Sequence, residues 1–228
     1  DRFVLSKGHC SPALYSTLAC KGYFDKKELQ TFRKLGSRLQ GHPDKNKLPG
    51  VDMTSGSLGQ GLSVANGMAL SSKLNHDGYR VYCLLGDGEL EEGQVWEAAM
   101  SSNKYKLDNL CVIVDYNGLQ IDGNIEEVKS LKHIYDKFKS FGFNVISIDG
   151  NNVEELIASF DLAKQIKQRP TVVIAKTTKG KGVSFMEGKA QWHGKSPNDE
   201  EYNIAMNELR EKEHSILEMQ KKDSEGGI

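Results

Sequence analysis

The sequence lacks a long apolar run, closely spaced cysteines and any large excess of charge of one sign. No apolar run approaches the roughly twenty residues that a membrane-spanning helix needs, so we expect no membrane segment. The first residues do not resemble a secretory signal peptide, and we therefore expect a cytoplasmic protein. The 30 basic and 31 acidic residues give a net charge of -1. This balance argues against nucleic acid or an anionic membrane surface as a partner.

The four cysteines do not form a Cys-x-x-Cys motif. Cys10 and Cys20 lie near the start of the chain, whereas Cys83 and Cys111 lie within apolar runs that read as buried strands. We therefore expect reduced thiols, two of them in the core.

The pattern along the chain alternates between helix-like and strand-like segments. With 228 residues, 38% of them hydrophobic and 27% charged, the chain is typical of one soluble globular domain. The alternation predicts an α/β fold in which a largely parallel sheet carries helices on both faces. We expect helices over residues 12–21, 26–35, 61–74, 91–105, 131–141 and 153–168, and a charged, solvated helix from 199 to about 220. We expect strands over residues 80–85, 109–115, 144–148 and 171–176, a loop over 37–59 and a mobile tail over 223–228.

Two turns follow neighbouring strands of this sheet. Gly86-Asp87-Gly88 follows one apolar run, and Asn117, 30 positions after Asp87, follows the next. The ends of parallel strands meet at one edge, where open α/β sheets bind ligands. Mg²⁺ and Ca²⁺ prefer oxygen ligands, so the pair predicts a metal-held diphosphate. Gly-Asp-Gly and Asn-Gly are also ordinary turn sequences, but their combination at two strand ends favours the site.

The six histidines fall into two groups. His76, His133 and His214 stand among charged or loop residues, which is typical of solvated side chains. His9, His42 and His193 each have a glycine neighbour. Glycine lets the backbone approach a ligand closely while the imidazole binds it or moves a proton. From the residues alone, a functional role and an ordinary surface role both remain open for this second group.

The spacing of Gly86-Asp87-Gly88 and Asn117 resembles the thiamine-diphosphate signature. Residues 1 to about 198 resemble transketolase in several further motifs: Ser6-Lys7-Gly8-His9, Gln40-Gly41-His42-Pro43, Gly56-Ser57-Leu58-Gly59-Gln60-Gly61, Asn117-Gly118-Leu119-Gln120-Ile121-Asp122-Gly123, Lys179-Gly180-Lys181-Gly182 and Trp192-His193-Gly194. Tyr116 stands where the general signature often has a second asparagine, but the ligand position is filled. The resemblance implies the thiamine-diphosphate-binding fold, with residues 1–228 as a single diphosphate- and metal-binding domain.

The same resemblance implies thiamine diphosphate and Mg²⁺, or Ca²⁺, as cofactors. Asp87 and Asn117 match the side-chain ligands of the metal, and Leu119 matches a residue that binds it through its backbone carbonyl. Residues matching the diphosphate contacts are His9, Gly88 and His193, and Lys179 matches a position where some transketolases hold the cofactor with lysine and others carry an aliphatic residue. Residues matching the contacts of the cofactor rings are Gly56, Ser57 and Leu58 for the aminopyrimidine and Ile121 for the thiazolium. Lys179 also fits a flexible Gly-Lys-Gly loop.

The implied chemistry is the transfer of a two-carbon ketol unit between sugar phosphates, in which the cofactor is the electron sink. His9, His42 and His193 match residues that line the substrate channel, so they would bind ketose hydroxyls and relay protons. Glu92 matches a glutamate of a carboxylate network that crosses to another subunit. It also fits a simple partner of a helix dipole.

The resemblance covers only part of a transketolase. An N-terminal helical segment is expected to be missing, and so is the pyrimidine-binding domain with the glutamate that activates the cofactor. The chain therefore resembles the N-terminal subunit of a split transketolase, which would need a C-terminal subunit in a hetero-oligomer with two copies of each chain.

Three alternatives stay open at this point. The chain also fits a 1-deoxyxylulose-5-phosphate synthase-like subunit, a transketolase subunit for a sulfonated or branched sugar, or a non-catalytic partner with the same fold. Gln40-Gly41-His42-Pro43 and residues 89–94 favour transketolase, and the intact Asp87 and Asn117 argue against a non-catalytic role.

Overall fold

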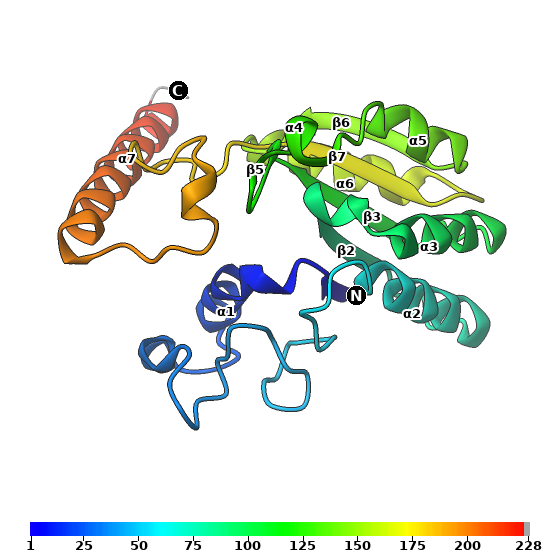
Figure 1. The fold of residues 1–228 in the computed structure, drawn as a ribbon, viewed down its shortest axis with the longest axis horizontal. Helices are drawn as coiled ribbons and strands as arrows, with labels where there is room; N and C mark the ends of the chain where they lie inside the picture. The colour runs from blue at the N-terminus through cyan, green and yellow to red at the C-terminus, as the bar shows by residue number, and fades with distance from the viewer. Residues whose placement is uncertain (226–228) are drawn as a thin grey trace.

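The computed structural model describes residues 1–225 and is built around a five-stranded sheet of order β1-β2-β3-β7-β6 (Figure 1). Every neighbouring pair in this sheet is parallel, which confirms the predicted architecture. Its strands are β1 (Arg2–Leu5), β2 (Val81–Gly86), β3 (Leu110–Tyr116), β6 (Asn144–Asp149) and β7 (Thr171–Lys176). A small antiparallel pair, β4 (Leu119–Gln120) and β5 (Gly123–Asn124), follows β3.

Helices cover both faces of the sheet, as the alternating pattern predicts. The α-helices are α1 (Ser11–Cys20), α2 (Gly61–Asn75), α3 (Gly93–Lys104), α4 (Ile125–Lys129), α5 (Ile134–Ser140), α6 (Val153–Gln165) and α7 (Asp199–Glu225). Short 3₁₀ helices are η1 (Gly8–Cys10), η2 (Lys26–Thr31), η3 (Gly88–Glu91) and η4 (Ala190–His193). Helices α2, α3 and α5 pack on one face, and α6 packs on the other. None of the helices in residues 1–225 has the length and apolar character needed to cross a bilayer.

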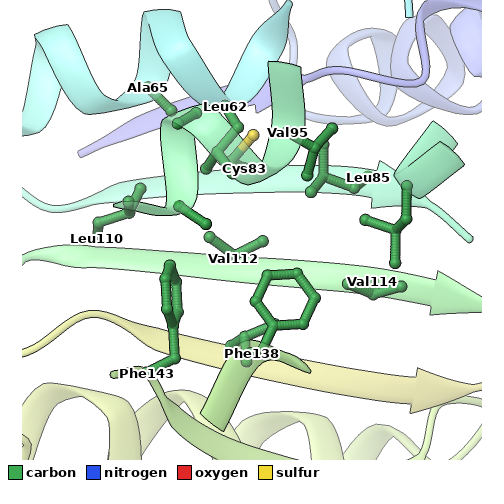
Figure 2. Packing of buried hydrophobic residues seen from close by; sticks show 14 of the residues in the cluster. Leu62, Ala65, Cys83, Leu85, Val95, Leu110, Val112, Val114, Phe138 and Phe143 are labelled. Carbon is green, nitrogen blue, oxygen red and sulfur yellow. The ribbon is translucent and has the colours of Figure 1, made fainter. Parts of the chain in front are cut away.

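The central strands are apolar because they are buried between these helices. Figure 2 shows Cys83 and Leu85 of β2 and Val112 and Val114 of β3 facing side chains from the covering helices. The helix-borne members of this cluster shown there include Leu62, Ala65, Val95 and Phe138. Each fully buried aliphatic side chain contributes about 1.5–3 kcal/mol relative to an exposed one, so the strand ends stand on a rigid platform. All four cysteines are free, and Cys83 and Cys111 are buried as predicted.

The predicted helix over 26–35 is wrong beyond its first turns. Only the 3₁₀ helix η2 forms, because Arg33 adopts a positive φ of 59° and its N–H donates to the carbonyl of Leu39. This contact turns the chain back on itself. The loop over 37–59 then runs without helix or strand, as predicted. Its apolar residues Leu39, Leu48 and Val51 pack against α1, so the loop is anchored to the rest of the protein.

Other elements also differ from the prediction, including the helices expected over 131–141 and 153–168, which span Ile134–Ser140 and Val153–Gln165. The first strand, β1, was not predicted, since only its last two residues are buried and it shows little alternation. The helix predicted over 91–105 begins at Gly93, because Glu92 is extended (φ -74°, ψ 123°) between η3 and α3. Helix α7 continues to Glu225, beyond its predicted end near residue 220, and residues 226–228 of the predicted mobile tail lie outside the described part of the chain.

Helix α7 stands apart from the sheet (Figure 1), and its first half contacts the segment that follows β7. Ala205 is buried, and Glu208 accepts hydrogen bonds from the N–H (2.7 Å) and hydroxyl (2.5 Å) of Ser184. The side chains over residues 209–222 are exposed, which confirms the predicted solvated helix.

Candidate functional site

The candidate site lies at the carboxyl edge of the sheet, where β1, β2, β3 and β7 end side by side. The register places Gly86 opposite Asp115 and Tyr116 opposite Lys176. The residues that follow these strands therefore meet: Lys7 after β1, Asp87 after β2, Asn117 after β3 and Thr177 after β7. The sequence-based expectation that Asp87 and Asn117 meet at one edge is confirmed.

Asp87 joins the two predicted turns. Its side chain is buried, with one oxygen accepting the N–H of Gly88 (2.8 Å) and the other accepting the N–H of Gly118 (2.6 Å). Gly118 has a φ of +74°, a conformation that strongly favours glycine. Burial raises the pKa of Asp87 against the lowering effect of these two hydrogen bonds. A buried carboxylate in this state gains stability from a nearby cation.

The oxygen donors at this edge fit a hard cation. Beside Asp87, the side-chain oxygen of Asn117 accepts the N–H of Leu119 at 3.0 Å, so the amide is held within the same turn. Residues 1–225 contain no group of three or more His, Cys, Asp or Glu side chains that could hold a metal ion. A site here would instead combine one carboxylate, one amide, the carbonyl of Leu119 and oxygens of a bound anion, as Mg²⁺ commonly does.

Gly88 is placed where a side chain would not fit comfortably. A Cβ atom there would lie 3.2 Å from Cβ of Gln120. Its N–H, predicted to bind diphosphate, donates to Asp87 in this structure.

A buried ion pair, which sequence reasoning missed, crosses the same edge. The ammonium of Lys7 lies 2.6 Å from one oxygen of Asp115, and the hydroxyl of Thr177 donates to the other. Burial tends to lower the pKa of Lys7, but the Asp115 carboxylate outweighs it and the pKa is raised; the pKa of Asp115 is correspondingly lowered. The available signal was the position of Asp115 at the end of the strand predicted over 109–115, whereas the strand before Lys7 was not predicted.

Two predicted histidines, His9 and His193, cluster with Lys179 beside this pair. The rings of His9 and His193 stack with centroids 4.9 Å apart, and the ammonium of Lys179 lies 3.3 Å from Nδ1 of His193. Burial and then Lys7 lower the pKa of His9 to about 4, while burial and Lys179 lower that of His193. Both rings are therefore neutral at pH 7. Burial and Lys7 also lower the pKa of Lys179, as expected for cations that lack an anionic ligand.

The third predicted histidine, His42, lies beside the Gly56-Ser57-Leu58 strip. A Cβ atom at Gly56 would lie 3.2 Å from the ring of His42, and one at Gly8 would lie 2.6 Å from Oγ of Ser55. The turn before His9, the loop of His42 and the strip Gly56-Ser57-Leu58 therefore meet. Oγ of Ser55 is buried without a hydrogen-bond partner. An unpaired buried hydroxyl beside the strip fits a hydrogen bond to a polar group of a ligand or to water.

Glu92 and Ile121 are not drawn into the buried edge. Glu92 is exposed at the start of α3, and among residues 1–225 its side chain has no hydrogen bond or ion pair. Its Cβ packs close to Gly59, where an added Cβ would lie 2.8 Å away. Ile121 is 70% exposed. The structure therefore gathers the predicted diphosphate residues and leaves these two on an open surface.

Comparison with known proteins identifies the family. Residues 1–221 match the family described as "Transketolase, thiamine diphosphate binding domain". The chain belongs to this transketolase family. It is 46% identical over 212 residues to an apulose-4-phosphate transketolase subunit of Phocaeicola vulgatus, covering 93% of this chain and 75% of that protein. It is also 46% identical over 209 residues to 6-deoxy-6-sulfo-D-fructose transketolase subunit SqwG of a Clostridium species, covering 92% and 76%.

The fold of this transketolase-family chain matches solved transketolases. The crystal structure of transketolase from Campylobacter jejuni superposes with a TM-score of 0.85 at 36% identity. The match covers 91% of this chain but only 34% of that one, so the chain spans about a third of the solved enzyme. The predicted family, fold and thiamine-diphosphate-binding domain are confirmed. The divalent metal and the individual site residues remain predictions.

Proposed function

We propose that this chain is the thiamine-diphosphate-binding subunit of a two-component transketolase that transfers a two-carbon ketol unit between anionic sugars. The observation that carries this proposal is the arrangement at the carboxyl edge. Buried Asp87 links the two turns, and the cations of Lys7 and Lys179 lie with neutral His9 and His193 beside them. Such an edge suits a diphosphate with a divalent cation.

Each group has a defined task in this proposal. Asp87, Asn117 and the carbonyl of Leu119 would hold Mg²⁺, and Lys179 with His9 and His193 would hold the diphosphate. When bound, thiamine diphosphate supplies the electron sink for carbon–carbon cleavage. Neutral imidazoles donate from one nitrogen and accept at the other, so His9, His42 and His193 can bind the sugar hydroxyls and pass protons.

The open side of the site supports a second subunit. His42, Ser57 and Glu92 are exposed, and Ile121 is 70% exposed, although the resemblance places all four near the cofactor or an adjoining subunit. The two relatives named above are themselves called transketolase subunits. The second subunit would supply the pyrimidine-binding surface and a carboxylate partner for Glu92. We expect two copies of each chain in the assembly, in the cytoplasm.

The sugar is proposed only as a class. One relative is named for a sugar phosphate and the other for a sulfonated fructose, and the two are equally similar to this chain. Both names describe a ketose that carries an anionic group. We therefore propose that the donor is a ketose with a phosphate or sulfonate at the end remote from the transferred carbons.

A reconstitution experiment tests the proposal. The chain is mixed with a C-terminal transketolase subunit, Mg²⁺ and thiamine diphosphate, and ketol transfer is followed from phosphorylated and sulfonated ketoses. We expect turnover from the mixture and none from either component alone. The matched control replaces the chain with its Asp87→Ala variant, which should be inactive in the same mixture. Robust turnover by the chain alone, with contaminating transketolase excluded, would overturn the two-component proposal.

A further inference from the structure

A second buried carboxylate, Glu89, lies close to the site and has no role in the function proposed above. It belongs to η3, two residues after Asp87, and is 2% exposed. One of its oxygens accepts the hydroxyl of Ser6 (2.5 Å) and the N–H of Gly59 (2.8 Å). The other accepts the N–H of Gly86 (3.1 Å). All three partners donate, so each oxygen of the carboxylate acts as a hydrogen-bond acceptor.

These three donors come from separate segments of the chain. Ser6 follows β1, Gly86 ends β2, and Gly59 directly follows the strip Gly56-Ser57-Leu58. The oxygen of Ser6 in turn accepts the N–H of Gly61 at 3.1 Å, at the start of α2. A Cβ atom at Gly61 would lie 2.3 Å from Oγ of Ser6, so glycine is needed for this close approach. Glu89 is therefore the point at which the segments are tied together.

Two of these segments are expected to hold opposite ends of the cofactor. The Gly86-Asp87-Gly88 turn serves the diphosphate and metal, and the Gly56-Ser57-Leu58 strip serves the aminopyrimidine. We propose that Glu89 is a positioning residue that fixes the strip relative to the turn, so that both ends of thiamine diphosphate are held at once. This inference rests on the function proposed above, and it adds a residue that touches neither cofactor nor substrate.

A positioning role and a merely structural role make different predictions for ligand binding. Inorganic pyrophosphate with Mg²⁺ needs only the turn, whereas thiamine diphosphate needs the turn and the strip in the correct relative position. Loss of the tie should therefore weaken binding of the whole cofactor more than binding of pyrophosphate. General destabilisation would not separate the two ligands.

The test is the Glu89→Gln variant, assayed as this chain in the reconstituted assembly. Glutamine keeps the size of the side chain, but its NH₂ group must then face a donor, because every neighbour of the carboxylate donates. Calorimetry should show thiamine diphosphate affinity falling about 10- to 100-fold, as expected when hydrogen bonds to a buried charged group are lost. Pyrophosphate affinity should fall much less at the same Mg²⁺ concentration.

Glu91→Gln is the matched control. It makes the same chemical change in the same short helix, but Glu91 bonds only to the side chain of Gln120 (2.8 Å) among the described hydrogen bonds. Both affinities should stay close to those of the wild type. Circular dichroism of all variants checks that the fold is retained. If Glu89→Gln does not fold, Ser6→Ala, which removes one of the three donors, should show the same split with a smaller loss.

The outcomes separate the inference from the proposed function. Equal losses for both ligands, or no loss for either, would overturn the positioning role of Glu89 while the wild type still binds the cofactor. Failure of the wild-type assembly to bind thiamine diphosphate would overturn the proposed function itself.

Discussion

The two ends of the candidate site differ in how completely this one chain builds them. At the diphosphate end, Asp87 is 2% exposed and the side chain of Lys7 is 8% exposed, and both have short hydrogen bonds or ion pairs. At the substrate end, His42 and Glu92 are exposed and Ile121 is 70% exposed. The diphosphate end is therefore preorganised without a ligand, whereas the substrate end is an exposed surface.

The difference follows from the elements that build each end. The diphosphate end rests on the ends of four parallel strands that share a packed core, so the positions of its side chains are fixed together. The substrate end is assembled from the loop over 37–59, the residue before α3 and the turn after β4. A sheet edge can organise charges by itself, whereas loops need a further surface to enclose a substrate.

The largest effect is expected from Asp87→Ala, which removes the carboxylate that joins the two turns. Mg²⁺-dependent affinity for thiamine diphosphate should fall by more than about 100-fold, since losing even an outer partner of a metal ligand costs about 10- to 100-fold. Calorimetry on the assembly measures this loss, with exposed Asp122→Ala as the control that should bind normally. Unchanged affinity in Asp87→Ala would mean that the preorganised end is not the metal site.

Lys7→Met tests whether the stability of the diphosphate end depends on the ion pair between Lys7 and Asp115. Methionine keeps most of the side-chain volume but leaves the Asp115 charge unpaired. Urea unfolding should show a loss of about 2–3 kcal/mol, below the roughly 3–5 kcal/mol of a fully buried pair, because Asp115 is 28% exposed. The double variant with Asp115→Asn removes the stranded charge and should recover part of the loss. A single variant as stable as the wild type would show that the pair is not structural.

His42→Ala tests the role of the substrate end in turnover. Because His42 is exposed and lies beside the strip, its loss should lower turnover of the assembly by about 100-fold, a typical contribution of a proton-transfer residue. Cofactor affinity measured by calorimetry should change little. His214→Ala on the exposed part of α7 is the control and should leave both quantities unaltered. If cofactor affinity fell while turnover per bound cofactor stayed unchanged, His42 would instead be part of the diphosphate end.

The smallest effect is expected in acid. The pKa of His9 is about 4 in the folded protein, below its ordinary value of 6.5, so the unfolded chain binds a proton first as the pH falls. The contribution of His9 to the free energy of unfolding is thus fully present above pH 6.5 and is lost progressively as the pH falls toward 4. The free energy of unfolding is measured with urea at pH 7 and at pH 4.5. Its decrease between the two pH values should be smaller in His9→Gln than in the wild type. An identical loss in both proteins would show that His9 is not held neutral.

The sequence predicted the sheet well because its strands are buried on both faces. The apolar runs that became β2, β3 and β7 need no long-range information to be recognised, and their order in the chain alternates with amphipathic helices. The short edge strand β1 was missed because pairing with β2, rather than its own pattern, makes it a strand. The helix expected over 26–35 stopped early because a backbone contact between Arg33 and Leu39 reversed the chain.

The types of residue at the site were likewise readable from the sequence. Asp87, Asn117 and the glycine-flanked histidines stood out by spacing and by neighbours, and the resemblance to transketolase rested on those residues. Glu89, Lys7 and Asp115 did not stand out, because a charged residue near a turn is ordinarily solvated. Only the fold shows that these three are drawn under the site and paired.

By itself, the sequence determined the family, the parallel sheet and the residues able to hold an anion and a cation. These features depend on local periodicity and on short motifs whose residue types can be recognised without knowledge of tertiary contacts. The tertiary structure decided which charges became buried partners, which glycines were needed for close approach, and which half of the site was closed. Those features arise where segments such as Ser6, Gly59 and Gly86 converge on one carboxylate, and no single stretch of sequence contains that convergence.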